Sequence, residues 1–340
     1  MSRFSYYIEM SKEIHLLKAT PKVWNYIKYR FLKRKALMSV RRYTPQIASL
    51  FLTMRCNLNC GYCNSAKIFR EGKVNWRESE ATLGKVKSIF ANPLFANCIF
   101  VDLSGGEPLL VQDLDHIVAY LAKRGHTTNV ITNGLLLNER IVELKRAGVS
   151  RISISLYDEN LSAMKNELEE INKVFPVHTS IVLLRSAIEK NSDKILDMAR
   201  FAYKSGCLSL RFFMYRPLGV DPDIKEIITD TYPAYIEFRH MMEDALPEFC
   251  VWPAVIKTKT VKKLCPQLWQ RISCDMLGNM LICCGTDMML QGKNSNLFHS
   301  EPDILFNHST LLDMRKQLLS PGCEPPDICK TCNLLGDPGW

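Results

Sequence analysis

Short apolar segments recur along the middle of the chain and predict buried strands. Six of them have strand length, at residues 48–53, 98–103, 127–132, 151–156, 177–184 and 209–215. Between several of them, apolar residues are spaced as on one face of a helix: Leu114, Ile117, Val118 and Leu121; Ile141 and Leu144; and Ile195, Met198, Ala199 and Ala202. Gly125, Gly148 and Gly206 follow these three patterns, and glycine commonly ends a helix.

The repeated order of strand, helix and glycine predicts an α/β fold with a parallel sheet. Right-handed crossovers between the strands are expected to curl this sheet into a full or partial barrel. Functional groups in such folds lie at the carboxyl ends of the strands. The residues that follow each apolar segment are therefore the candidates for chemistry.

Length and composition narrow the class of protein. The chain has 340 residues, of which 47% are hydrophobic and 23% charged, as is typical of a folded protein with a catalytic domain and a smaller second one. No stretch of about 18 apolar residues is present, and the first residues lack the order of a secretory signal. We therefore expect a cytoplasmic protein.

Positive charge is concentrated at the N-terminus. The formal net charge is +9, and residues 1–42 account for all of it, with eleven Lys and Arg against two Glu. Val23, Ile27 and Phe31 recur there at helical spacing. One interpretation is a basic amphipathic helix that contacts a membrane surface or a polyanionic partner; the other is a helix that packs its apolar stripe on the body of the protein. The remaining residues are neutral overall, which argues against nucleic-acid binding.

Three cysteines follow the first predicted strand. Cys56, Cys60 and Cys63 lie within eight residues on a predicted loop. Three thiolates can hold three irons of a cubane iron–sulfur cluster, and the absence of a fourth leaves one iron open, as a catalytic metal requires. A zinc knuckle that lacks one ligand, or surface thiols without a shared role, are the alternatives.

The residues around these cysteines resemble those of the radical S-adenosylmethionine (radical SAM) superfamily. The C-x3-C-x2-C spacing, with Tyr62 before the last cysteine, Arg55 before the first, and Asn57-Leu58-Asn59 inside the motif, is similar to members of that superfamily. The resemblance implies a partial (β/α)6 barrel of the radical SAM type. It also implies that the three cysteines hold a [4Fe–4S] cluster whose open iron binds S-adenosylmethionine.

A second motif and several strand ends supply the residues expected to bind that cofactor. Ser104 begins the sequence SGGEP after the second predicted strand, where the superfamily has its GGEP motif. Its glycines permit close approach of the backbone, and the loop carbonyls and Glu107 can accept hydrogen bonds from the methionine ammonium group. Ser153 and Ser155 resemble positions that contact the ribose or carboxylate. The expected cofactor-binding residues are Tyr62, Gly105, Gly106, Glu107, Pro108, Asn133, Ser153, Ser155 and Arg185.

The other large cysteine group lies near the C-terminus. Cys265, Gly278 and Cys283 form a C-x12-G-x4-C pattern, and Cys329 and Cys332 form a later C-x2-C. Four thiolates can complete a cubane cluster or hold zinc in a tetrahedral site. Spacing alone does not separate these two kinds of site.

A hairpin and a second resemblance favour an iron–sulfur cluster there. Residues 271–274 and 279–283 are predicted to pair around a turn. The region resembles the Twitch domain, a shortened form of the SPASM extension of radical SAM enzymes, which implies one auxiliary [4Fe–4S] cluster on Cys265, Cys283, Cys329 and Cys332. Three cysteines are left over from this assignment: Cys274, Cys284 and Cys323.

These features predict four parts of the chain. They are a basic amphipathic N-terminal arm at 1–45, a radical SAM core at 46–220, a helical linker at 221–262, and a small β-hairpin and helix Twitch domain at 263–340.

The resemblance implies an enzyme with radical chemistry. An electron donor such as flavodoxin or ferredoxin would reduce the first cluster, and cleavage of S-adenosylmethionine would give a 5′-deoxyadenosyl radical that abstracts hydrogen from a substrate. We expect oxidation or dehydrogenation of a small-molecule, sugar or lipid-linked substrate, because the 45-residue N-terminal extension is short for a peptide-recognition domain. The alternatives are crosslinking or epimerisation of a ribosomally made peptide, and a non-catalytic redox sensor. The sequence singles out no acid–base catalyst.

Overall fold

One eight-stranded sheet organises the structure. The computed structural model describes residues 22, 24, 25, 44–63, 76–216, 224–253, 255–256, 265, 267–283, 288–320, 322–330 and 332–335. The strand order is β7-β6-β5-β4-β3-β2-β1-β8, and every neighbouring pair is parallel. The strands are β1 (Ile47–Phe51), β2 (Phe100–Ser104), β3 (Thr127–Thr132), β4 (Arg151–Ser155), β5 (Val177–Leu183), β6 (Ser209–Met214), β7 (Cys250–Val251) and β8 (Arg271–Asp275).

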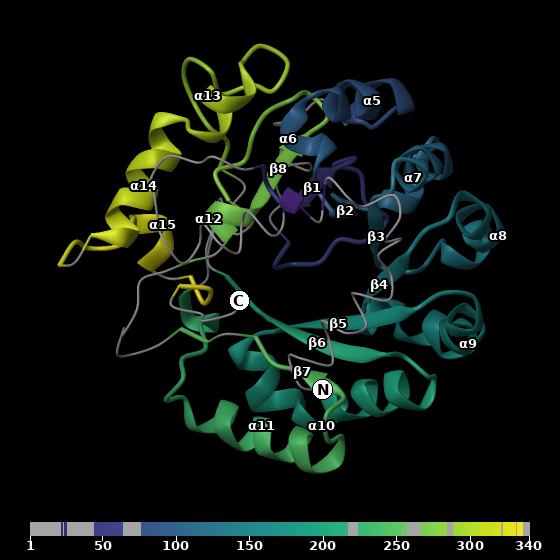
Figure 1. Cartoon of the computed structure of the whole chain (residues 1–340). Helices are drawn as coiled ribbons and strands as arrows, with labels where there is room; N and C mark the ends of the chain where they lie inside the picture. The colour runs from purple at the N-terminus through teal and green to yellow at the C-terminus, as the bar shows by residue number, and fades with distance from the viewer. Residues whose placement is uncertain are drawn as a thin grey trace.

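The sheet curves into an open barrel. Its strands form an arc with helices along the outside (Figure 1), and β7 and β8 are the two ends of the strand order. The outer helices are α5 (Leu83–Ala91), α6 (Pro93–Ala96), α7 (Leu114–Lys123), α8 (Leu137–Ala147), α9 (Asp158–Val174), α10 (Arg185–Lys204) and α11 (Pro233–Ala245). The partial radical SAM-type barrel predicted from the sequence is thus confirmed.

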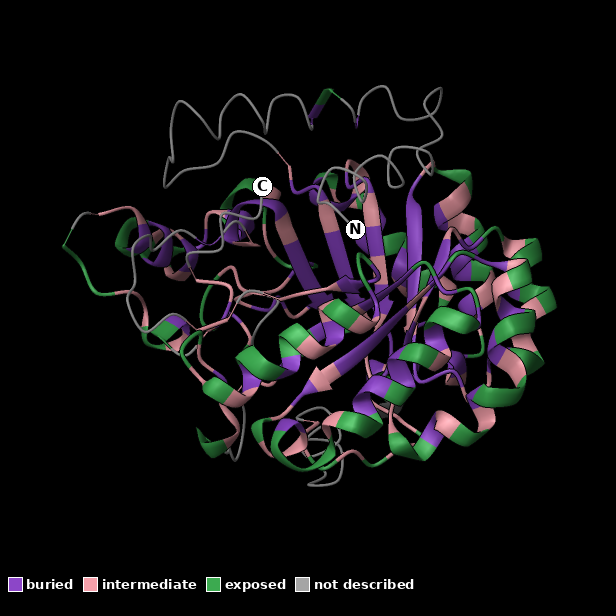
Figure 2. Cartoon of the chain, turned by 90° about the horizontal axis from the view of Figure 1, so that it is seen from below, coloured by how far each residue is buried: buried purple, intermediate pink, exposed green. Residues whose placement is uncertain are grey.

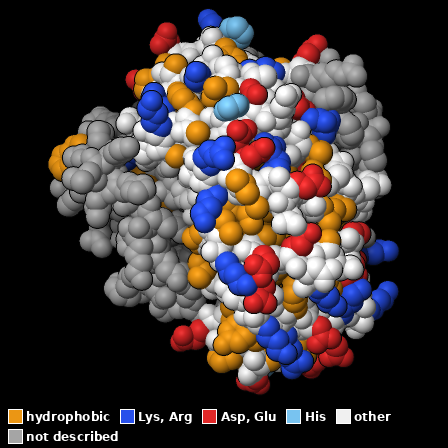
Figure 3. Space-filling view, turned by 90° about the vertical axis from the view of Figure 1, so that its right-hand side faces the viewer, with side chains coloured by type: hydrophobic (Ala, Val, Ile, Leu, Met, Phe, Trp, Pro, Cys, Tyr) orange, Lys and Arg blue, Asp and Glu red, His pale blue; other side chains and the backbone are white. Residues whose placement is uncertain are grey.

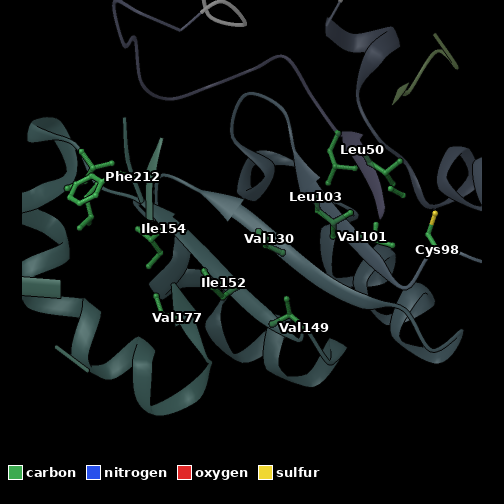
Figure 4. Close-up of a cluster of buried hydrophobic side chains, with 14 of the residues drawn as sticks. Leu50, Cys98, Val101, Leu103, Val130, Val149, Ile152, Ile154, Val177 and Phe212 are labelled. Carbon is green, nitrogen blue, oxygen red and sulfur yellow. The ribbon is translucent and has the colours of Figure 1, made fainter. Parts of the chain in front are cut away.

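The convex face of the sheet and the helices share the hydrophobic core. Each of four strands points a wholly buried side chain toward the helices: Val101, Val130, Ile152 and Phe212 (Figure 4). Burial of each such side chain contributes about 1.5–3 kcal/mol. Figure 2 shows buried residues along the strands and on the helix faces that contact them, with exposed residues on the outer faces.

The outer surface carries both signs of charge. On the side formed by α7 to α9, Lys and Arg are interspersed with Asp and Glu, and hydrophobic side chains occur in small groups (Figure 3). This mixture agrees with the neutral charge balance of the chain beyond residue 42.

The predicted strands and helix ends are confirmed. All six apolar segments form strands β1 to β6, and Gly148 ends α8 in the left-handed conformation, with φ 83°. Gly125 and Gly206 also have positive φ, at 74° and 82°. Helix α9 was not predicted, because its buried residues Met164, Leu168 and Ile171 occur only about once per turn among charged neighbours.

The C-terminal part joins the main sheet. The predicted hairpin is present, since Cys274 bridges Met280 in antiparallel sense and Leu281 N donates to Ser273 O at 3.0 Å. Its first strand, β8, also pairs in parallel with β1, which the sequence did not indicate. The other elements here are α12 (Gln267–Gln270), α13 (Pro302–Phe306), α14 (Ser309–Leu319) and α15 (Asp327–Lys330), and a further short helix, α4 (Trp76–Ser79), precedes α5.

Five residues of the N-terminal arm are described, at positions 22, 24, 25, 44 and 45. Lys22 and Asn25 are buried, whereas Trp24 is 59% exposed. Lys22 Nζ donates to Arg124 O at 3.0 Å, and Asn25 Nδ2 donates to Thr44 O at 3.0 Å. The stripe at 23, 27 and 31 lies outside the described residues, so lipid contact stays a prediction. Within the described part of the chain, no helix is long and apolar enough to cross a membrane.

Candidate functional site

The first cysteine group lies beyond the carboxyl end of β1. Leu52 N donates to Ser104 O at 2.8 Å, which continues the β1–β2 pairing past the strand ends. The loop with Cys56, Cys60 and Cys63 follows, and all three cysteines are partly exposed. Cys63 N donates to Cys60 O at 3.1 Å, so a tight turn brings the last two cysteines together.

The GGEP motif packs directly against the backbone that leads into this loop. Gly106 N donates to Thr53 O, and Glu107 N donates to Arg55 O, both at 2.7 Å. A Cβ atom on Gly105 would lie 2.3 Å from Thr53 O, and one on Gly106 would lie 2.1 Å from Arg55 O. Only glycine fits at either position, because real Cβ atoms do not approach an oxygen so closely.

Glu107 ties this motif to the end of β3. Its side chain is fully buried. Oε1 accepts from Leu109 N at 2.9 Å and from Thr132 Oγ1 at 2.7 Å, and Oε2 accepts from Asn133 N at 2.8 Å. Burial raises the pKa of this carboxyl above its ordinary value, although the three hydrogen bonds oppose the shift. A carboxylate has about four acceptor positions, so one position on Oε2 remains for the predicted bond to the cofactor ammonium.

Asn133 connects β3 to the cysteine loop. Its Nδ2 donates to Asn57 Oδ1 at 2.7 Å and lies 3.9 Å from Cys56 Sγ. Burial raises the pKa of the Cys56 thiol, and the hydrogen bonds from Leu58 N and Asn133 act in the opposite direction. Burial also raises the pKa of Cys60, to about 11, with a contribution from the neighbouring charges of Glu159, Cys63 and Cys56.

Two tyrosines stand beside the cysteines. The Tyr62 and Tyr157 rings are tilted at 49° with centroids 6.2 Å apart. Burial raises the pKa of both phenols, that of Tyr157 to about 12, so both are neutral at physiological pH. Sequence reasoning missed Tyr157 and its neighbour Asn160, because neither belongs to a motif and the helix that carries Asn160 was not predicted.

The two predicted serines lie on the concave face of β4, as their alternation requires. Ser153 Oγ donates to Asn129 Oδ1 at 2.8 Å, and Ser155 Oγ lies 3.3 Å from Ser180 Oγ. Arg185 is placed differently. Its Nε donates to Glu189 Oε1 at 3.1 Å, and its guanidinium lies 4.4 Å from the centroid of the Tyr232 ring, so these contacts do not join it to the cysteine loop.

The concave face below the loop is polar. Strand register places Arg151, Arg211 and Arg271 on it, together with Asp102 and Asp275. Arg271 Nη1 contacts Asp102 Oδ2 at 2.7 Å, and Asp275 accepts backbone hydrogen bonds within the hairpin turn, including one from Leu277 N at 2.9 Å.

His178 lies among the basic groups of this face. Burial lowers its pKa, and the positive charges of Arg151 and Arg211 lower it further, to about 3. His178 is therefore neutral at pH 7, and the positive charge of the face resides in its three arginines.

The C-terminal cysteines lie before α12, at the end of the hairpin, in α15 and just after α15. Cys265 is buried just before α12, and Cys283 is partly exposed at the end of the hairpin. Cys332 N donates to Cys329 O at 3.1 Å, which forms a turn at the end of α15. Among the left-over cysteines, Cys274 is fully buried on β8 and Cys323 is exposed; Cys284 lies outside the described residues.

The loop residues fit an open iron–sulfur cluster by their chemistry. Three thiolates on one short loop are the donor set that such clusters use, and Cys56 and Cys63 are near enough for the charge of one to raise the pKa of the other. Over the described ranges, no three Cys, His, Asp or Glu side chains converge on one point as they would around a single metal ion. A cubane, whose irons are bound by separate cysteines, spreads its ligands more widely.

Comparisons with known proteins agree with this site. Residues 50–160 match the family model described as the radical SAM superfamily. The chain is 31% identical over 200 residues to the GTP 3′,8-cyclase of Aquifex aeolicus (strain VF5). The aligned region covers 54% of this chain and 61% of that protein. It is 29% identical over 213 residues to the GTP 3′,8-cyclase of Clostridium botulinum (strain Hall), covering 58% and 63%. The chain thus spans less than two thirds of these relatives' own length.

Solved structures show the same fold over more of the chain. Streptococcus suis SuiB bound to S-adenosylmethionine has a TM-score of 0.64 at 15% identity, covering 89% of this chain and 75% of that one. SuiB bound to the precursor peptide SuiA has a TM-score of 0.62 at 16% identity, covering 91% and 75%.

The matched region contains the cysteine loop, the GGEP motif and Asn133. Proteins of this family bind S-adenosylmethionine and a [4Fe–4S] cluster. Residues 50–160 of the chain thus form a radical SAM domain.

Proposed function

We propose that this protein is a radical SAM enzyme acting on a small anionic molecule held against the concave face of the open barrel. The observation that carries the proposal is the concave face of the sheet, on which three arginines lie: Arg211 in the middle of β6, and Arg151 and Arg271 at the amino ends of β4 and β8. Guanidinium groups pair in bidentate fashion with carboxylates and phosphates.

The residues at the carboxyl edge have separate tasks. Cys56, Cys60 and Cys63 hold the cluster, and the backbone of Gly105 and Gly106 lies beside them to receive the cofactor. Cluster and S-adenosylmethionine together supply a 5′-deoxyadenosyl radical that removes hydrogen from the substrate. The rings of Tyr62 and Tyr157 exclude water beside the cysteines, which protects reactive species from quenching.

The cleavage of S-adenosylmethionine is tested on anaerobically reconstituted protein. We expect the wild type to form 5′-deoxyadenosine when reductant and S-adenosylmethionine are present, and Cys56→Ala to form none. Cys98→Ala is the matched control, because Cys98 is buried against Leu94 O, away from the loop. Formation of 5′-deoxyadenosine by Cys56→Ala would contradict the proposal, as would its absence from the wild type.

The substrate is tested by label transfer. The curated relatives are GTP 3′,8-cyclases by name, so GTP deuterated on the ribose is the first compound to try, followed by deuterated phosphorylated sugars and their unphosphorylated forms. We expect deuterium in 5′-deoxyadenosine only from anionic compounds, and a KM raised about tenfold or more in Arg211→Gln. Transfer from the neutral forms alone would contradict an anionic substrate.

A peptide substrate is the second candidate. SuiB, whose fold this chain shares, is bound to a precursor peptide in one of its structures. Radical crosslinking or epimerisation of a peptide would require a partner peptide that co-purifies with the chain. Label transfer from such a peptide, without transfer from small anions, would favour this candidate.

An auxiliary [4Fe–4S] cluster on Cys265, Cys283, Cys329 and Cys332 completes the proposal. With four protein ligands, such a cluster has no open iron, so its role is electron transfer to or from the substrate radical. The iron content should be about eight per chain in the wild type and about four in the double variant Cys329→Ser, Cys332→Ser. Cys323→Ser should retain about eight, and loss of iron in that variant would place the ligand at Cys323 instead.

A further inference from the structure

The cysteine loop is anchored to the barrel at two points. At the first, Asn57 Oδ1 accepts from Asn133 Nδ2 at 2.7 Å. At the second, the Tyr62 ring lies against Tyr157, with centroids 6.2 Å apart. Asn133 follows β3 and Tyr157 follows β4, so the two anchors come from adjacent strands.

One buried amide joins both anchors. Asn160, in the first turn of α9, is fully buried. Its Nδ2 donates to Asn133 O at 2.6 Å and to Ser155 O at 2.7 Å, while its Oδ1 accepts from Tyr157 N at 2.8 Å. Both amide hydrogens and the amide oxygen are in use, so this side chain fixes the ends of β3 and β4 relative to each other.

The first anchor also touches a cysteine sulfur. Asn133 Nδ2 lies 3.9 Å from Cys56 Sγ. The same sulfur accepts a hydrogen bond from Leu58 N at 3.4 Å. Hydrogen bonds to cysteine sulfurs are among the factors that set the reduction potential of an iron–sulfur cluster. A donor stabilises the more negative, reduced form, so its removal makes the potential more negative.

We propose that Asn160 is a positioning residue that sets the reduction potential of the first cluster by holding Asn133 against Cys56. Asn160 touches neither cofactor nor substrate; it acts through the backbone of Asn133 and Tyr157. The inference rests on the proposed cluster at Cys56, Cys60 and Cys63.

The test measures the midpoint potential of the first cluster in the anaerobically reconstituted full chain, by a redox titration followed by electron paramagnetic resonance without S-adenosylmethionine. Asn160→Leu keeps the branched shape of the wild-type side chain, with bulkier methyl groups in place of the amide atoms, and lacks all three hydrogen bonds. Asn133→Leu keeps the backbone contacts of Asn133 and removes only its amide, so it remains informative if Asn160→Leu folds poorly. We expect a more negative potential in both variants, with a changed spectrum of the reduced cluster.

Asn172→Leu is the matched control. Asn172 lies on the same helix and donates through Nδ2 to Ser205 O at 2.9 Å and to Leu168 O at 3.2 Å, at the opposite end of α9. We expect it to lower the thermal midpoint without moving the potential. An unchanged potential in Asn160→Leu and Asn133→Leu, or an equal shift in Asn172→Leu, would overturn the inference. A wild type without a reducible cluster would instead overturn the proposed function.

Discussion

At the scale of single residues, the site requires two positions that have no side chain. Gly105 and Gly106 let two backbone segments approach to hydrogen-bonding distance, and no side chain of theirs enters the site. The glycines therefore position the cysteine loop before any cofactor binds, in addition to making room for the cofactor.

Substitution Gly106→Ala tests this structural role. The new Cβ would lie 2.1 Å from Arg55 O, and the backbone must move, which costs about 1–3 kcal/mol. We expect a thermal midpoint lower by several degrees and less iron bound after reconstitution.

Gly84→Ala is the control for Gly106→Ala. Its Cβ would meet only Thr82 Oγ1, at 3.8 Å, and alanine favours the helix α5 by about 1 kcal/mol. This variant should be slightly more stable and bind iron normally. Normal iron binding in Gly106→Ala would show that the close approach is not required for the cluster.

The Asp102–Arg271 pair predicts an acid-dependent stability. Burial alone would raise the pKa of Asp102, but the charges of Arg271 and Arg151 outweigh it and hold the pKa below its ordinary value of 3.8. A group with a lowered folded-state pKa stabilises the fold above its unfolded value, and this stabilisation is lost as the pH falls below about 4. Asp102→Asn should lose about 2–4 kcal/mol at pH 7 and show a flatter decline in acid, measured by urea unfolding from pH 3 to 7.

An exposed ion pair provides the comparison for Asp102. Asp158 and Lys194 lie 2.6 Å apart with both side chains about half exposed, and such pairs contribute less than about 1 kcal/mol. Asp158→Asn should therefore change the free energy of unfolding little at any pH. An equal loss in both variants would refute the special role of the buried pair.

The residues of the site differ in how far the sequence could predict them. Cys56, Cys60, Cys63 and the GGEP motif are contiguous and carry a family resemblance, so they were found directly. Asn160 contacts the backbone of Asn133, and Tyr157 contacts the ring of Tyr62, so both act through distant segments of the chain. A single polar residue in a helix gives no local signal for such a role.

At the scale of elements, strands were predictable wherever both neighbours bury them. The segments that became β1 to β6 are short apolar runs, and the sheet pairs each on two sides. Strand β8 escaped prediction as part of the barrel because its side chains alternate between polar Arg271 and Ser273 and apolar Ile272. Such alternation fits a hairpin and an edge strand equally well, and only the three-dimensional pairing with β1 distinguishes them.

The turn of the hairpin after β8 can be tested with two glycines of similar conformation. Gly278 has φ +80°, and a Cβ there would lie 2.6 Å from the Phe298 ring; Gly292 has φ +84° and open space around it. Gly292→Ala should cost about 1 kcal/mol from backbone strain alone. Gly278→Ala adds a steric clash and should cost about 1–3 kcal/mol more, which thermal unfolding would measure. Equal losses would show that the Phe298 contact is easily displaced.

At the scale of the whole molecule, the C-terminal region is part of the barrel. Strand β1 pairs with β2 on one side and with β8 on the other, and the residues paired across β1 and β8 are separated by 224 positions, as for Ile47 and Arg271. Buried Arg315 of α14 adds to this link, since its Nη2 donates to Leu268 O at 3.1 Å, just before β8. The boundary near residue 263 stays a prediction from the sequence, and the strand that follows it, β8, pairs with β1 of the predicted core.

Two truncated chains test whether the fold requires the pairing of β8 with β1. A chain ending at residue 262 lacks β8 and leaves β1 as an unpaired edge, which favours aggregation. It also loses the buried side chain of Ile272, a contribution of about 1.5–3 kcal/mol by itself. A chain ending at residue 320 keeps β8, the hairpin and α14 and loses the last cysteine pair with α15.

We expect the longer chain to be a soluble monomer with a thermal midpoint near that of the full chain. The shorter chain should unfold at a clearly lower temperature or aggregate. If instead the shorter chain were as stable as the longer one, β8 would be an accessory strand, and the core would fold without the region that carries the auxiliary cysteines.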